Sequence, residues 1–99
     1  MVVRISPNDL KFFEIRKESH KNFDPMPWGD LSEFWAQSLK WIGDAMRQST
    51  SQFFWSGSCY CWYTDDKQDH EQCVFMTANG IVMFQDITRG ELYRVSFKD

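Results

Sequence analysis

Apolar and polar residues follow two different periods along this chain, and the change falls near residue 50. From Asp30 or Ser32 to about Gln48, apolar residues recur every three or four positions, which is the spacing of an amphipathic helix. From Ser51 onward, short apolar runs alternate with turn residues, which is typical of strands. The pattern therefore predicts a helical first half and a sheet in the second half.

A further helix is predicted from Pro7 to Ser19. Ser6 would serve as its N-cap, and proline suits the first helical position because it has no amide hydrogen to satisfy there. A short strand at residues 2–5 would precede this helix. Pro25 and Pro27 predict a loop between the two helices.

Turn signals divide the second half into strands. Asn79-Gly80 lies between apolar runs, where it favours a tight type I′ hairpin, and Thr88–Gly90 resembles a second tight turn. The predicted strands are 52–63, 71–78, 81–86 and 91–97. The expected fold class is α+β, with two N-terminal helices packed on a four-stranded antiparallel β-meander. We expect one domain over residues 1–99, with 1–49 mainly helical and 51–99 forming the sheet.

A two-residue loop at Asn79-Gly80 fixes a register in which Thr77 faces Val82 and Phe75 faces Phe84. A further pairing of Phe84 with Tyr93 extends it to the last strand. This register sorts side chains into two sheet faces. The predicted core face holds Cys59, Cys61, Phe75, Thr77, Val82, Phe84, Tyr93, Val95 and Phe97. The opposite face holds Tyr60, Trp62, Val74, Met76, Ile81, Met83 and Leu92.

That opposite face is too apolar for an ordinary solvated surface, so it is either covered by a helix or used for binding. Aromatic residues and methionine are enriched at protein interfaces. The predicted partner-binding residues are Tyr60, Trp62, Met76, Met83 and Leu92, with Trp62 as the anchor. The neighbouring loop adds Asp65, Asp66 and Asp69, which either form a solvated turn or favour a basic partner.

The three cysteines give a second candidate site. Cys59 and Cys61 share one strand face, Cys73 is expected opposite Cys61, and His70 lies at the end of the adjoining loop. Three thiolates and one imidazole can hold zinc tetrahedrally. The alternative is that these cysteines are small buried apolar residues, as free cysteines often are.

Charge and motifs exclude several function classes. The net charge is −3, from 11 basic and 14 acidic residues, and no basic run is longer than two, so no nucleic-acid footprint is present. No apolar stretch approaches the ~18 residues of a membrane span, and we expect a cytoplasmic protein. Phosphate-binding loop, nucleophile-elbow and HExxH motifs are missing, so we do not expect an enzyme.

Together these features predict a small, non-catalytic protein that binds and inhibits another protein, like toxin-immunity proteins or phage-encoded inhibitors of host proteins. No cofactor is expected. One alternative is a zinc-binding or thiol-dependent module built on Cys59, Cys61, His70 and Cys73. Another is a homodimeric interaction domain that pairs through its open sheet face.

Overall fold

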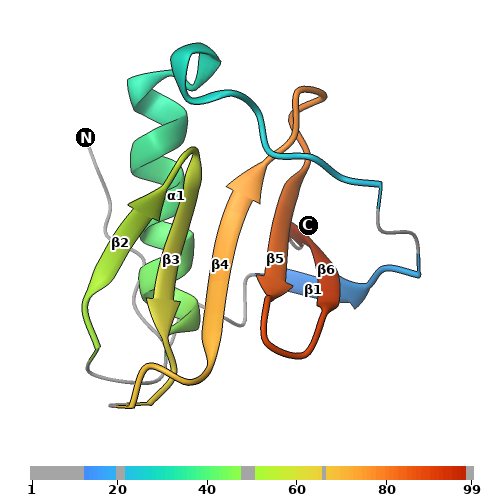
Figure 1. Ribbon diagram of the computed structural model, residues 1–99. Coiled ribbons are helices and arrows are strands. Elements are labelled where there is room, and N and C mark those ends of the chain that lie inside the picture. Colours follow the sequence, from blue (N-terminus) through green and yellow to red (C-terminus); the bar gives the residue numbers. More distant parts are fainter. Residues whose placement is uncertain (1–12, 20–21, 48–50, 66, 98–99) are drawn as a thin grey trace.

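One α-helix and a six-stranded antiparallel sheet form the described part of the chain (Figure 1). This computed structural model describes residues 13–19, 22–47, 51–65 and 67–97. The strands lie in the order β1-β6-β5-β4-β3-β2. In chain order, the elements are β1 (Phe13–Lys17), the 3-10 turn η2 (Trp28–Asp30), α1 (Glu33–Met46), β2 (Phe53–Ser56), β3 (Cys59–Tyr63), β4 (Glu71–Met76), β5 (Val82–Asp86) and β6 (Glu91–Phe97).

The predicted arrangement of two helices on a four-stranded meander is wrong. Within the predicted helix 7–19, residues 13–17 instead form strand β1, which pairs with β6 at the edge of the sheet. Phe13 and Ile15 alternate with Glu14 and Arg16, and Phe13 is buried opposite Phe97. Cross-strand pairing therefore decides the structure of residues 13–17, although Ser6-Pro7 carries a local helix signal. That signal, and the predicted strand at residues 2–5, lie outside the described residues.

The predicted strand 52–63 is a hairpin of two strands. Gly57 and Ser58 form the connecting turn, and Ser56 faces Cys59 across it. Gly57 has a φ of 58° while Ser58 does not have positive φ, which is the pattern of a type II′ turn. This extra hairpin adds β2 to the sheet as its terminal strand.

Helix α1 confirms the strongest prediction of the hydrophobic pattern. The Ser32 hydroxyl caps it by accepting a 3.2 Å hydrogen bond from the Trp35 amide. Its buried stripe packs on one face of the sheet, mainly over β3 and β4, as Figure 1 shows. The stripe consists of Leu39, Ile42, Gly43, Ala45 and Met46.

The predicted register between β4 and β5 is wrong by one residue. Met76 faces Val82 and Val74 faces Phe84, because the hairpin loop holds three residues, 78–80, instead of two. Gly80 alone in that loop has positive φ, at 81°, as expected for a type I turn followed by a glycine bulge. Because of this one-residue shift, each side chain of β4 points to the sheet face opposite to the predicted one. The predicted pairs Phe84–Tyr93 and Cys61–Cys73 are confirmed.

Two apolar clusters fill the two sheet faces of this small, compact single domain, whose radius of gyration is 12.8 Å. The larger cluster lies between α1 and the sheet and includes Trp62, Val74 and Met76. The smaller one lies on the other face around Phe75 and Met83, with Phe23 packed against it. The loop after β1 passes the top of the sheet on its way to α1 (Figure 1). The described residues contain no helix long and apolar enough to cross a membrane.

Candidate binding surface

Four aromatic rings contact one another in series along β2 and β3. Phe53 stacks on Tyr60 with centroids 4.4 Å apart, and Tyr60 lies 4.7 Å from Trp55. Trp55 meets Trp28 edge to face at 5.0 Å. We call Phe53, Tyr60, Trp55 and Trp28 the aromatic ladder. Trp28 is 53% exposed, so the ladder runs from the α1–sheet core to open surface.

The hairpin register explains how the ladder forms. Trp55 faces Tyr60 across the strands, and Phe53 faces Trp62, so these side chains share the sheet face that α1 covers. Such cross-strand aromatic pairs contribute roughly 0.2–1 kcal/mol each. Trp28 reaches the ladder from η2, immediately before α1. Two segments distant in sequence, η2 and the β2–β3 hairpin, thus converge at the β2 edge.

A groove of about 300 Å³ runs between α1 and this hairpin. Its apolar floor is formed by Trp41, Phe53 and Tyr60. The Arg47 guanidinium lies 4.2 Å from the centre of the Phe53 ring and 3.8 Å from the Asp44 carboxylate. Burial raises the pKa of the Tyr60 hydroxyl above its ordinary value. The groove therefore combines an aromatic floor with the charged side chains of Lys40, Asp44 and Arg47.

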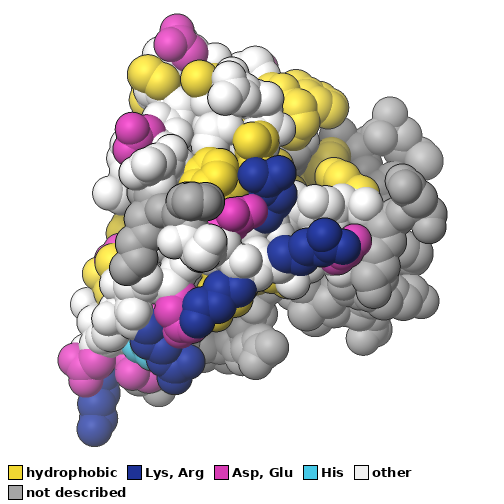
Figure 2. Space-filling model, turned by 90° about the vertical axis from the view of Figure 1, so that its right-hand side faces the viewer, with side chains coloured by type: hydrophobic (Ala, Val, Ile, Leu, Met, Phe, Trp, Pro, Cys, Tyr) yellow, Lys and Arg dark blue, Asp and Glu magenta, His cyan; other side chains and the backbone are white. Residues whose placement is uncertain are grey.

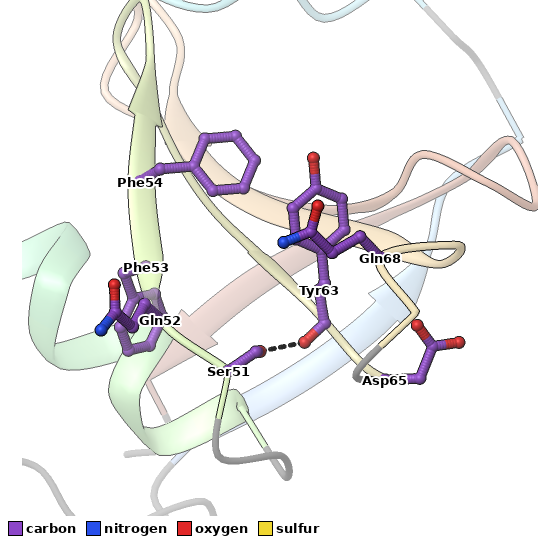
Figure 3. A pocket seen from close by; sticks show the side chains of 7 residues that line it. All are labelled: Ser51, Gln52, Phe53, Phe54, Tyr63, Asp65 and Gln68. Carbon is purple, nitrogen blue, oxygen red and sulfur yellow. Dashed lines mark hydrogen bonds between the residues drawn. The ribbon is translucent and has the colours of Figure 1, made fainter.

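A second hollow, of about 360 Å³, lies on the opposite face of the same hairpin (Figure 3). Phe54 and Tyr63 stack there with ring centroids 5.2 Å apart, and the Ser51 hydroxyl donates a hydrogen bond to the Tyr63 carbonyl. Asp65 and Gln68 complete its wall. One Asp65 carboxylate oxygen accepts a 3.1 Å hydrogen bond from the Asp69 amide, which orders the acidic loop.

The sequence-predicted binding residues do not lie on one face. Trp62 is 0% exposed and, with Met76, is buried under α1. Met83 and Leu92 are buried in the cluster on the other face. Of the five apolar residues, Tyr60 alone belongs to the aromatic ladder. Asp65 and Asp69 lie in the loop beside the second hollow, and Asp66 is outside the described residues.

The structure separates His70 from the three cysteines. Cys59, Cys61 and Cys73 lie together on the face away from α1, and Cys61 and Cys73 are buried. The hydrogen bond with Cys59 is the main cause that raises the pKa of the Cys73 thiol, and burial adds to it. His70 instead points to Asp86. Among residues 13–19, 22–47, 51–65 and 67–97, no group of three or more His, Cys, Asp or Glu residues could hold a metal ion.

Asp86 is the centre of a buried polar network. It is 4% exposed, and both carboxylate oxygens lie 2.8 Å from the His70 Nε2 atom. Gln72 donates to it at 3.2 Å and in turn accepts from the Trp62 indole at 3.2 Å. Burial alone would raise the pKa of Asp86, but hydrogen bonds from His70, the Arg89 amide and Gln72 hold it below the ordinary value.

This network links two parts of the fold. It joins the β3–β4 loop to the turn after β5, and the Thr88 hydroxyl reinforces the connection by accepting from the Glu71 amide at 2.9 Å. A histidine–aspartate pair needs an adjacent nucleophile for covalent catalysis. The nearest candidate in the sequence, Cys73, lies on the other sheet face in the second cluster.

On the β1–β6 side of the molecule, the described side chains carry charges of both signs. Figure 2 shows this side, where basic and acidic side chains lie next to one another. Arg94 pairs with Glu18 at 3.0 Å, and Lys17 with Glu91 at 3.1 Å. The charges there largely neutralise each other, so the β2 edge is the more distinctive surface.

Sequence analysis did not single out Phe53, Trp55 or Trp28. The available signal was Gly57 between two aromatic runs, FFWS and CYCWY, which marks a turn and hence an additional strand. Trp28 carried no such signal because its contact with Trp55 depends on the tertiary fold. No protein-family model, curated protein or solved structure matches the chain.

Proposed function

We propose that this protein is a non-catalytic binding protein, which recognises another protein through the aromatic ladder and the adjoining groove. The observation that carries the proposal is the half-exposed Trp28 at the end of a continuous series of rings. Tryptophan and tyrosine dominate interface hot spots because they bury a large area at low cost in conformational entropy. Because Trp62 is buried, we assign the role of the anchor residue to Trp28 instead.

Inhibition is the mode of action that we propose for this binding. A small domain that places a rigid aromatic surface against an enzyme can block access to the enzyme's site, as toxin-immunity proteins and phage-encoded inhibitors do by class. The ladder suits this role because neighbouring rings restrain one another, which reduces the entropy lost on binding. The buried Asp86 network stabilises the sheet that supports the ladder without taking part in chemistry.

Affinity capture from a cell lysate with the tagged full chain tests the proposal, followed by titration of the purified pair. Trp28→Ala is expected to weaken binding by about 2 kcal/mol or more, as for a hot-spot residue. Phe97→Ala is the matched control, since Phe97 is 63% exposed at the other end of the sheet. Both variants must keep the circular dichroism of the wild type.

One stoichiometric partner that Trp28→Ala loses and Phe97→Ala retains would support binding through the ladder. Addition of the wild-type protein should then reduce that partner's activity in a purified assay. A partner retained equally by both variants would contradict the surface assignment. Absence of any saturable partner in lysates from several sources would contradict the binding function itself.

A further inference from the structure

Among the described residues, strand β2 is an edge of the sheet that pairs with β3 alone. It is the terminal strand in the order of the described sheet, and it carries Phe53, Phe54, Trp55 and Ser56, with neither a charge nor a proline. Edge strands commonly carry charges, prolines or bulges that block further pairing. Every second residue of an edge strand also directs its backbone N–H and C=O away from its neighbour. The β2 edge can therefore receive one more antiparallel or parallel strand.

The two hollows flank this strand on opposite faces. Phe53 lines both of them, while Tyr60 belongs to the groove beside α1 and Tyr63 to the hollow on the other face. Figure 3 shows Phe54 and Tyr63 next to each other in the second hollow. Side chains of an added strand would alternate between the two faces. Successive residues of such a strand would thus enter the groove and the second hollow in turn.

The two hollows differ in chemistry. The groove has a floor of Trp41, Phe53 and Tyr60. Its Arg47 pairs with Asp44, and Lys40 adds a second positive charge to the lining. The second hollow is bordered by Asp65, with Asp69 bonded to it and Lys67 in the same exposed loop. An aliphatic or aromatic side chain fits the apolar floor of the groove, and a basic side chain complements the Asp65 carboxylate in the second hollow.

We infer that β2 binds an extended segment of a partner protein by strand addition, and that this segment alternates basic and apolar residues. Main-chain hydrogen bonds to the edge supply affinity, and the two hollows select alternate side chains. The inference rests on the proposed binding function and defines the partner's recognised segment. It predicts that recognition depends on backbone amides as well as on side chains.

The probe is an eight-residue peptide of alternating lysine and valine, acetylated and amidated, titrated into the ¹⁵N-labelled full chain and followed by amide chemical shifts. The expected result is saturable shifts at residues 53–56, with β1 at the other edge of the sheet unaffected. The same peptide with glutamate in place of lysine should bind at least about ten-fold more weakly. N-methylation of every second residue removes the amide donors along one edge of the lysine–valine peptide and leaves the other edge intact, so this peptide should still bind through its intact edge. A peptide methylated along both edges should not bind.

Two variants sharpen the side-chain assignment. Asp65→Asn keeps the acceptor for the Asp69 amide but removes the negative charge. It should therefore reduce the difference in affinity between the lysine–valine and the glutamate–valine peptides. Asp24→Asn, at an exposed loop position, is the control and should leave that preference unchanged. Equal binding of the two peptides to the wild type, or shifts that avoid residues 53–56, would overturn the inference.

The outcomes also separate this inference from the proposed function. Loss of a captured partner in Trp28→Ala, combined with no peptide-induced shift at β2, would retain the binding function and refute strand addition. Shifts at residues 53–56 that depend on protein concentration before peptide is added would identify a second copy as the occupant and overturn the peptide assignment. If the peptide binds at β2 but no captured partner is lost in Trp28→Ala, strand addition at β2 would be supported. The aromatic ladder would then be refuted as the binding surface.

Discussion

Gly43 lies directly against the ring of Tyr60, so closely that a Cβ atom at position 43 would stand 2.9 Å from the Tyr60 Cδ2 atom. The same Cβ would lie 3.3 Å from ring atoms of Phe53 and Trp62. Glycine in mid-helix normally costs about 1 kcal/mol relative to alanine. Here the missing side chain allows α1 to approach the sheet at the point where the aromatic ladder begins.

Gly43→Ala should therefore destabilise the protein, although alanine is the better helix former. Overpacking at this contact is expected to outweigh the helix propensity and to give a net loss of about 1–2 kcal/mol. Urea unfolding at neutral pH measures the change. Gly29→Ala is the matched control, because a Cβ there meets nothing within 4 Å. An increase in stability for Gly43→Ala would show that α1 and Tyr60 are not in close contact.

Trp62→Ala should cost about 3–5 kcal/mol, the range for removing a large buried aromatic side chain. The indole is completely buried and donates to Gln72, so the variant loses packing and leaves the amide oxygen without this donor. Chemical denaturation provides the measurement. The exposed Phe34→Ala, at 68% exposure, should change stability by less than about 1 kcal/mol. A Trp62→Ala variant as stable as Phe34→Ala would place residue 62 on the surface.

The corrected hairpin register predicts different effects at the two residues of Asn79-Gly80. Gly80 has a φ of 81°, so Gly80→Ala should cost about 1–2 kcal/mol through backbone strain. Asn79 does not have positive φ, so Asn79→Ala causes no such backbone strain and should lower the stability much less than Gly80→Ala does. Thermal unfolding of both variants distinguishes the cases. Equal, large losses would instead indicate a type I′ turn with positive φ at both positions.

Asp86 should make stability depend on pH in the acid range. Its folded-state pKa lies below the unfolded value of about 3.9, so its contribution is complete above that value and is lost as pH falls through the folded pKa. Asp86→Asn should be destabilised by about 1–3 kcal/mol at pH 7 because the paired carboxylate is removed. The difference from the wild type should shrink towards pH 2 in denaturation series. A difference that stays constant from pH 7 to pH 2 would rule out this linkage.

The hydrophobic pattern alone determined the elements whose signals are local. The period of three to four residues placed a helix from Asp30 or Ser32 to about Gln48, and α1 spans Glu33–Met46. Strict alternation in residues 91–97 located β6, and turn residues identified the loops around β4 and β5. These signals suffice because amphipathicity and turn conformation depend on neighbours only a few positions apart.

Long-range pairing decided what the sequence could not. Residues 13–17 became a strand because β6 offered a partner edge, and the three-residue loop at Gly80 reversed the side of β4. A shift of one residue exchanges the two faces of a strand, so Trp62 became core. The half-exposed Trp28 reaches the aromatic ladder from η2 through a contact that only the tertiary fold creates. The sequence by itself determined a helix, a hairpin-rich sheet and an excess of aromatic residues. Only the tertiary structure decided which of those rings reach the surface, because burial depends on contacts between segments that are distant in the chain.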